Sequence, residues 1–126
     1  MIEILNSPDH IVVTRVTGRM SEADVQRIRA EVEARLTRNP CIASVADITG
    51  LKGATLKAMA MDVRFGMFKN RHRKRFPREA AISASPWVRA FTKVMAPLAP
   101  RVERRAFSPE EVEAAINWAG DILPKG

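Results

Sequence analysis

The sequence contains no tyrosine and a single cysteine, Cys41, among its 126 residues. A lone thiol cannot form an intramolecular disulfide, so the cysteine content does not indicate a secreted protein. No stretch approaches the roughly 18–20 apolar residues of a membrane-spanning helix. The N-terminal MIEILNSPDH lacks the basic and apolar regions of a signal peptide. We therefore expect a cytoplasmic protein.

Residue patterns for catalysis or metal binding are also missing. His10 lies in a predicted turn and His72 in a basic run, and neither has a partner at the spacing of a metal site or catalytic triad. Cys41 opens a predicted buried strand, where a free cysteine usually acts as a small hydrophobic residue. The sequence GLKG at 50–53 is too weak a motif to indicate a phosphate-binding loop. We predict a protein that is not an enzyme and has no catalytic residues, metal site or cofactor.

The pattern of apolar residues predicts alternating strands and helices. Short apolar or β-branched runs predict strands at 2–5, 11–16, 41–48, 80–82 and 102–107. Capping residues followed by apolar stripes predict helices over 21–36, 55–70, 85–98 and from 108 onward. We expect Gly18 to end the second strand and 49–53 to be a loop. Interleaved charges in 102–107 predict an edge strand.

The predicted element order is ββαβαβαβα. The first two strands are close enough in sequence for an antiparallel hairpin. The later strands alternate with helices, and short connections of that kind require parallel pairing with right-handed crossovers. The sequence shows no linker, internal repeat or low-complexity segment. We therefore predict an α/β fold with a mixed sheet, in a single domain that covers 1–126.

The helix predicted over 55–70 is apolar on two opposite faces. At 100° per residue, one face carries Leu56, Met59, Ala60, Val63 and Met67, and the other carries Ala58, Met61, Phe65 and Phe68. One face should pack on the sheet. The other should meet a neighbouring helix, a second subunit, an apolar ligand or a membrane. We predict that the candidate ligand or dimer face consists of Met61, Phe65, Phe68 and, from the next helix, Trp87.

Positive charge is concentrated directly after this helix. The chain has a net charge of +7, and the segment 69–78, KNRHRKRFPR, holds six cations and no acid. These cations are Lys69, Arg71, Arg73, Lys74, Arg75 and Arg78. A cationic cluster beside an apolar helix face is typical of reversible binding to an anionic membrane surface, although a solvated charged loop has the same composition. RNA is the weaker alternative, because Phe76 is the only aromatic residue in the run.

Three segments resemble the SpoIIAA-like family, a branch of the STAS-domain fold. They are the opening MIEIL with its two-strand start, the stretch ADITGLKGATLKAMAMDVRFGMF at 46–68, and SPWVRAFTKVMAPLAP at 85–100. The second segment contains a D-x-x-F-G pattern at Asp62, Phe65 and Gly66. The resemblance covers nearly the whole chain and implies a STAS-like α/β fold. The family is also likened to CRAL-TRIO lipid-binding domains.

The same resemblance implies a regulatory alternative. Anti-sigma-factor antagonists of the STAS class carry an Asp-Ser pair at the start of the second helix, and the serine is phosphorylated. This sequence has Gly53, Ala54 and Thr55 in the matching region. The Asp-Ser pair is therefore absent, and Thr55 is the candidate phosphoacceptor.

The sequence thus favours a non-enzymatic binding or regulatory domain. We predict that it engages an apolar ligand or an anionic membrane surface through helix 55–70 and the basic run 69–78. We expect a homodimer that is cytoplasmic or peripheral at the inner membrane face. The alternative is a protein-interaction regulator of the anti-sigma-factor-antagonist type, switched at Thr55. An RNA-associated accessory domain is the weaker alternative.

Overall fold

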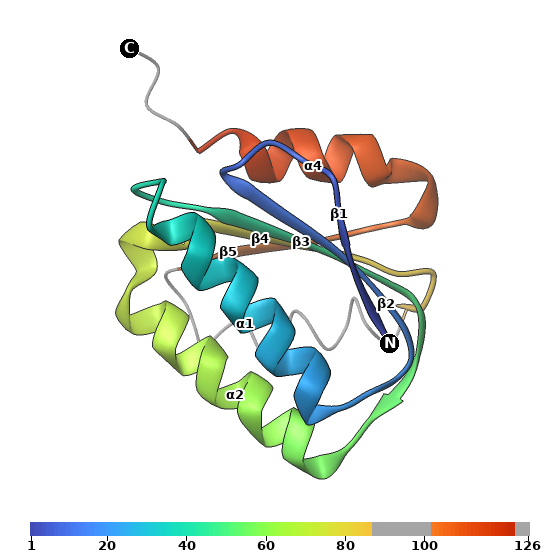
Figure 1. Cartoon of the computed structure of the whole chain (residues 1–126). Coiled ribbons are helices and arrows are strands. Elements are labelled where there is room, and N and C mark those ends of the chain that lie inside the picture. Colours follow the sequence, from blue (N-terminus) through green and yellow to red (C-terminus); the bar gives the residue numbers. More distant parts are fainter. Residues whose placement is uncertain (87–101, 123–126) are drawn as a thin grey trace.

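In the computed structural model, which describes residues 1–86 and 102–122, the strands form one five-stranded sheet in the order β1-β2-β3-β4-β5 (Figure 1). The strands are β1 (Ile2–Leu5), β2 (Ile11–Met20), β3 (Ala43–Ala54), β4 (Arg78–Ile82) and β5 (Glu103–Phe107). β1 pairs antiparallel with β2, and all other neighbours pair parallel. The predicted α/β fold, the N-terminal hairpin and the edge position of the last strand are confirmed.

Helices cover both faces of this sheet (Figure 1). The helical elements are α1 (Glu22–Leu36), α2 (Leu56–Arg71), η1 (Arg73–Arg75), η3 (Pro109–Glu111) and α4 (Val112–Gly120). α1 and α2 lie on one face and α4 lies on the other. Ser21 and Asp24 form the predicted capping box at the start of α1. Most of the helix predicted over 85–98, including Trp87, falls outside the described residues.

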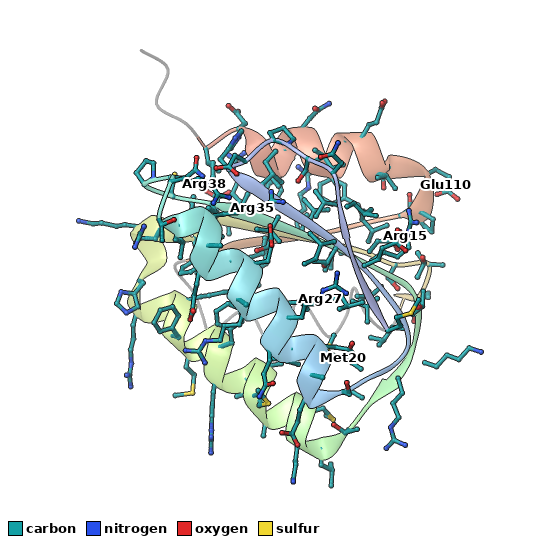
Figure 2. All side chains as sticks on the ribbon, in the orientation of Figure 1. Arg15, Met20, Arg27, Arg35, Arg38 and Glu110 are labelled. Carbon is teal, nitrogen blue, oxygen red and sulfur yellow. The ribbon has the colours of Figure 1, made fainter. Side chains whose placement is uncertain are left out.

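Arg35 anchors α1 to the start of β2 (Figure 2). Its guanidinium donates to the backbone carbonyl of Ile11 at 2.5 Å and to the Ser7 hydroxyl at 3.1 Å. Its Nε donates to Glu31 at 2.8 Å, so the buried charge has an acidic partner on the same helix. These bonds hold the helix against the β1–β2 turn.

Two strands extend further than the sequence predicts. β2 continues through Gly18 to Met20, and β3 includes the segment 49–53 that was predicted to be a loop. The two extensions pair with each other, with register shifts on either side of Gly18. Gly18 has a φ of +67°, which a glycine adopts without the steric cost of a Cβ atom. The glycine therefore allows an irregularity within the strand, and the prediction that it ends the strand is wrong.

The side chains of the sheet alternate between two cores. Those that face α4 include Ile11, Val13, Ala43, Val45, Ala80, Ile82 and Phe107. On the side of α1 and α2, Val12 of β2 and Ile42, directly before β3, pack with Val32, Phe65 and Phe76. Residues that alternate along a strand point to opposite faces, so the two cores use opposite positions of the same strands. The functional features described below lie on the α1/α2 side.

Candidate functional site

Helix α2 turns its aromatic face inward. Phe65 is only 4% exposed, and Met61 and Phe68 are half-buried. Phe65 is therefore too buried for the dimer face predicted from the sequence, whereas the alternative that this side of the helix contacts an apolar ligand stays a prediction. Trp87, the fourth residue of that predicted face, lies outside the described residues.

The inward orientation follows from the partners that the sheet side offers. Phe65 packs edge-to-face on Phe76, with ring centroids 6.4 Å apart, and it stacks on Phe68 at 6.2 Å. The Arg29 guanidinium of α1 lies 5.6 Å from the Phe65 ring centroid. Ala58, which is fully buried, adds almost no bulk to this inner face. Aromatic rings bury the most apolar area per residue, so this face gains more from the core.

The opposite face of α2 carries a stripe of exposed apolar side chains. Its large members are Leu56 (84% exposed), Met59 (54%), Val63 (52%) and Met67 (54%). Their spacing of three and four residues places them in one line along the helix. Side chains project from α2 away from the sheet along its length (Figure 2). We call these four residues the outer stripe.

Cations border the outer stripe on one side. Lys57, Arg64 and Arg71 are exposed and follow one another at intervals of seven residues, which places them on the same flank of the helix. Lys57 also lies 3.7 Å from Glu22 of α1. The one acidic residue of the helix, Asp62, is on the other flank.

The basic run predicted to act as one patch is divided by the fold. Lys69 is mostly buried, and its ammonium lies 2.5 Å from Glu79. Arg78 donates to the Trp118 carbonyl at 2.7 Å and lies over the Trp118 ring. The prediction that both belong to a surface patch is therefore wrong.

The remainder of the run stays at the end of α2. Arg71 and Lys74 are exposed, and Arg73 lies in η1 between them. Arg75 is also exposed, although its guanidinium donates to the Leu36 carbonyl at 2.6 Å and thereby ties η1 to the end of α1. The surface charge near α2 is thus smaller than the sequence suggests, and Lys57 and Arg64 add to it from outside the predicted run.

A cavity of about 370 Å³ lies between the helices α1 and α2 and the sheet. Its walls are mainly apolar and include Val12, Val16, Met20, Ile28, Ile48 and Phe65. On the sheet side, the central strands contribute the small residues Ser44, Ala46 and Ala81. The register pairs Ala46 with Ala81 on neighbouring strands. These short side chains leave room beneath α2.

Charged residues close part of this cavity. The register places Glu79 beside Arg104, and Lys69 reaches the same carboxylate from α2. Lys69 binds Glu79 Oε1 at 2.5 Å and Arg104 Nε binds Oε2 at 3.1 Å. Burial raises the pKa of Glu79, but the charges and hydrogen bonds of the two cations outweigh it and hold the pKa below its usual value. We call Lys69, Glu79 and Arg104 the charged triad.

Asp62 lines the same cavity from α2. The residue is exposed to solvent. Burial raises the pKa of Asp62; Lys69 and Arg104 oppose that shift and the charge of Glu79 adds to it. No described residue forms an ion pair with Asp62 within 4 Å, so its negative charge is only partly compensated.

Thr55 caps helix α2, as its position in the sequence predicts. Its hydroxyl accepts a hydrogen bond from the Ala58 amide at 3.0 Å. The residue is half-buried and borders a shallow depression that Arg19, Glu22 and Lys57 also line. Thr55 therefore lies at the positive end of a 16-residue helix, beside Arg19 and a Lys57 that is paired with Glu22.

His10 and Cys41 lie apart from these features, whereas His72 caps the C-terminal end of α2. His10 lies 3.0 Å from the Gly120 carbonyl, the His72 ring packs on Phe68, and the Cys41 thiol lies 3.9 Å from the Ile122 carbonyl. Within residues 1–86 and 102–122, no three His, Cys, Asp or Glu side chains are grouped to hold a metal ion. No helix in those same ranges is long and apolar enough to cross a membrane.

Comparison with known proteins places the chain in a family. The model of the SpoIIAA-like family matches residues 11–120. The chain belongs to the SpoIIAA-like family. Its structure resembles that of an uncharacterized protein with a SpoIIAA-like fold from Shewanella loihica PV-4, with 25% identity and a TM-score of 0.73. That match covers 94% of this chain and 92% of the other.

Two structures of SpoIIAA share the fold at lower identity. The anti-sigma factor antagonist SpoIIAA in its unphosphorylated form is 14% identical, with a TM-score of 0.63 and coverage of 93% of this chain and 98% of that chain. The Bacillus cell fate determinant SpoIIAA in its phosphorylated form is 15% identical, with a TM-score of 0.61 and coverage of 90% and 97%. No curated protein matches the sequence. At these identities the two SpoIIAA structures show a common fold and no common activity.

Sequence reasoning missed the charged triad of this SpoIIAA-like domain. Glu79 precedes the predicted strand 80–82, and Arg104 was taken only as part of a charged edge strand. The sequence gave one signal, because Glu79 directly precedes Ala80, which is buried in β4. The pairing of Glu79 with Arg104 depends on the register of β4 and β5, which sequence alone does not supply.

Proposed function

We propose that this SpoIIAA-like domain is a non-enzymatic binding domain that docks on an anionic membrane surface through α2. The observation that carries this proposal is the outer stripe, whose four large apolar side chains are each more than half exposed. Soluble proteins seldom leave a line of such residues uncovered without an interaction that uses it. The stripe replaces Met61, Phe65 and Phe68 as the apolar contact.

The charges beside the stripe favour an anionic partner. Lys57, Arg64 and Arg71 follow its flank, and Lys74 extends the positive surface beyond the end of the helix. A Lys or Arg near an anionic leaflet contributes about 1 kcal/mol of binding free energy. This electrostatic binding free energy adds to the free energy gained when apolar side chains insert into the membrane, as in other interfacial helices.

The same charges oppose a homodimer built on this face. A two-fold interface places identical surfaces together. With the two-fold axis perpendicular to α2, two antiparallel copies would bring their cationic flanks into one contact, and each helix offers Asp62 as its only acid. An anionic lipid surface lacks that repulsion, so we prefer it to the predicted homodimer as the partner of the outer stripe.

Co-sedimentation with vesicles tests the proposal. We expect the wild-type chain to bind phosphatidylcholine vesicles that contain phosphatidylserine, to bind pure phosphatidylcholine weakly, and to lose binding as salt is raised. The double variant Met59→Glu, Met67→Glu should bind at least about tenfold more weakly, because it removes apolar insertion and adds negative charge.

A matched control introduces the same two negative charges at exposed positions outside α2. Ala30 and Ala114 are exposed on α1 and α4, so the variant Ala30→Glu, Ala114→Glu should retain most of the binding. Equal losses in the two double variants would contradict docking through α2. Analytical ultracentrifugation measures the oligomeric state and so tests the dimer alternative. If wild type is a dimer and Met59→Glu, Met67→Glu is a monomer, the outer stripe is a subunit interface.

A second candidate function rests on Thr55. We propose it as a phosphoacceptor in a protein-interaction regulator, because its hydroxyl lies at the N-terminus of α2 beside Arg19 and Lys57. A phosphate is electrostatically favoured at such a helix terminus. Phosphopeptide mass spectrometry of the chain isolated from its own cells tests this: phosphate on Thr55 supports the switch, and an unmodified Thr55 contradicts it.

The cap itself yields a stability prediction. Thr55→Ala should lower the free energy of unfolding by about 1 kcal/mol, because the Ala58 amide loses its side-chain acceptor. Thr55→Ser, which keeps the hydroxyl, should stay close to wild type. Urea unfolding followed by circular dichroism measures both, and equal stability of the alanine and serine variants would contradict the capping role.

A further inference from the structure

The cavity beneath α2 has the size and lining of a small-molecule site. Its volume of about 370 Å³ falls within the roughly 300–1,000 Å³ that is common for ligand pockets. Ser44, Ala46 and Ala81 put short side chains on the sheet wall of this space, opposite the α2 residues that line it. Phe65 and Ile28 close it from the helix side. An apolar chain would therefore find apolar contacts on both sides.

The charged triad gives this apolar space a cationic wall. The side chains of Lys69, Glu79 and Arg104 are only 13%, 18% and 22% exposed. Each oxygen of Glu79 already accepts a hydrogen bond from one cation. Two cations thus share one carboxylate, and the triad holds one positive charge in excess.

Counted over residues 1–86 and 102–122, both cations keep hydrogen-bond donors that Glu79 does not use. An ammonium has three N–H donors and a guanidinium has five. Bonds with the described residues use one donor of Lys69 and one of Arg104, both on Glu79. Charge-assisted bonds to a carboxylate are stronger than neutral ones, so a carboxylate is the head group that these donors recognise best.

Asp62 is the opposing charge in the same cavity. Its carboxylate has no ion pair with any described residue, and burial and the nearby Glu79 raise its pKa. A second carboxylate placed at Lys69 and Arg104 would be repelled by an ionised Asp62. Removing the charge of Asp62 should therefore strengthen the binding of an anion, whereas removing the charge of Arg104 should weaken it.

We infer that the cavity binds a single-chain amphiphile with a carboxylate head group, such as a medium-chain fatty acid. The head group is held by Lys69 and Arg104, and the chain lies between Phe65 and the small residues of β3 and β4. This site uses the inner face of α2 and goes beyond the proposed membrane docking, which uses the outer face. Either can hold without the other.

Isothermal titration calorimetry with decanoate and decanol, both below their aggregation concentrations and without vesicles, tests the inference. We expect decanoate to bind wild type at least about tenfold more tightly than decanol, since the alcohol lacks the charge. Arg104→Met should remove most of that preference, and Asp62→Asn should tighten decanoate binding severalfold with little effect on decanol. Ala81→Leu, which fills the cavity, should weaken both ligands.

Controls separate this site from the outer stripe and from misfolding. Arg64→Met removes an exposed cation of α2 outside the cavity, so it should weaken vesicle binding and leave decanoate binding unchanged. Ala30→Leu adds the same atoms as Ala81→Leu on the surface of α1 and should have no effect. Because Arg104→Met also removes an ion pair, Arg104→Lys keeps the charge and should restore part of the preference.

Three results would overturn the inference. Equal affinity for decanoate and decanol would exclude a head group at the charged triad. Decanoate binding that Ala81→Leu leaves intact would place the ligand elsewhere on the chain. Weaker decanoate binding in Asp62→Asn would contradict the assigned charges.

Discussion

Replacing Glu79 with glutamine should lower the free energy of unfolding by about 3 kcal/mol. Glu79 is the shared partner of Lys69 and Arg104, and all three side chains are mostly buried. Removing one member of a buried ion pair is costly, because the charge left behind has neither water nor a partner. In this domain the substitution leaves two like charges beside one cavity.

Urea unfolding of wild type and Glu79→Gln measures this effect. The matched control is Glu103→Gln on the next strand, because Glu103 pairs with Arg78 at 3.6 Å and its side chain is 66% exposed. Exposed ion pairs contribute about 0–1 kcal/mol, so the control should lie close to wild type. Similar losses in both variants would contradict the buried character of the triad.

The pH dependence gives a second check on Glu79. Its pKa in the folded state is below its usual value, so the folded state binds this proton less well than the unfolded state does. The stabilisation is therefore complete well above about pH 4.3, the ordinary pKa of glutamate. It is lost as the pH falls toward the folded-state value. The difference in stability between wild type and Glu79→Gln should narrow over that acidic range.

Phe65→Ala should cost about 3–5 kcal/mol of unfolding free energy. The side chain is 4% exposed and packs against Phe76 and Phe68. Deleting a buried phenylalanine loses its transfer free energy and leaves a cavity that the surroundings fill only in part. This loss of unfolding free energy is large only if the aromatic face of α2 is the buried one.

Met67→Ala is the matched variant on the other face of the same helix. Met67 is 54% exposed, and alanine has the highest helix propensity, so we expect a change of less than about 1 kcal/mol. Chemical denaturation of both variants compares the faces directly. A larger loss for Met67→Ala than for Phe65→Ala would reverse the orientation of α2 and with it the outer stripe.

Local chemistry was sufficient to predict most of the elements. The pairs Ser21–Asp24 and Ser108–Glu111 form the capping boxes that the spacing of the residues indicates. The β-branched run at 11–16 forms a strand whose Val12, Val13 and Val16 are buried. Caps and short periodic runs act within a few residues of chain, so they appear in the sequence itself. The family resemblance drew on the same local segments.

The orientation of α2 could not be predicted in this way. Its two apolar faces have nearly equal hydrophobicity by residue type, so the helical period gives two solutions. The choice between them depends on Phe76 and on Arg29 of α1, which meet Phe65 only after the chain folds. Shape and aromatic contact decide which face is buried, and both are properties of the assembled layers.

The lengths of β2 and β3 depend on pairing in the same way. The segment 49–53 has the composition of a loop, yet it pairs with the end of β2. The segment 49–53 would not form a strand alone, because it obtains backbone partners from the end of β2.

By itself, the amino-acid sequence determined the order of the elements, the caps of the helices, the family and the concentration of positive charge near α2. Those properties depend on neighbours in the chain. Only the tertiary structure shows that Lys69 and Arg104 both pair with the mostly buried Glu79. It also shows that Leu56 and Met59 are exposed to solvent. Strand register and helix rotation bring together residues distant in sequence, and the energies of burial and ion pairing are defined only there.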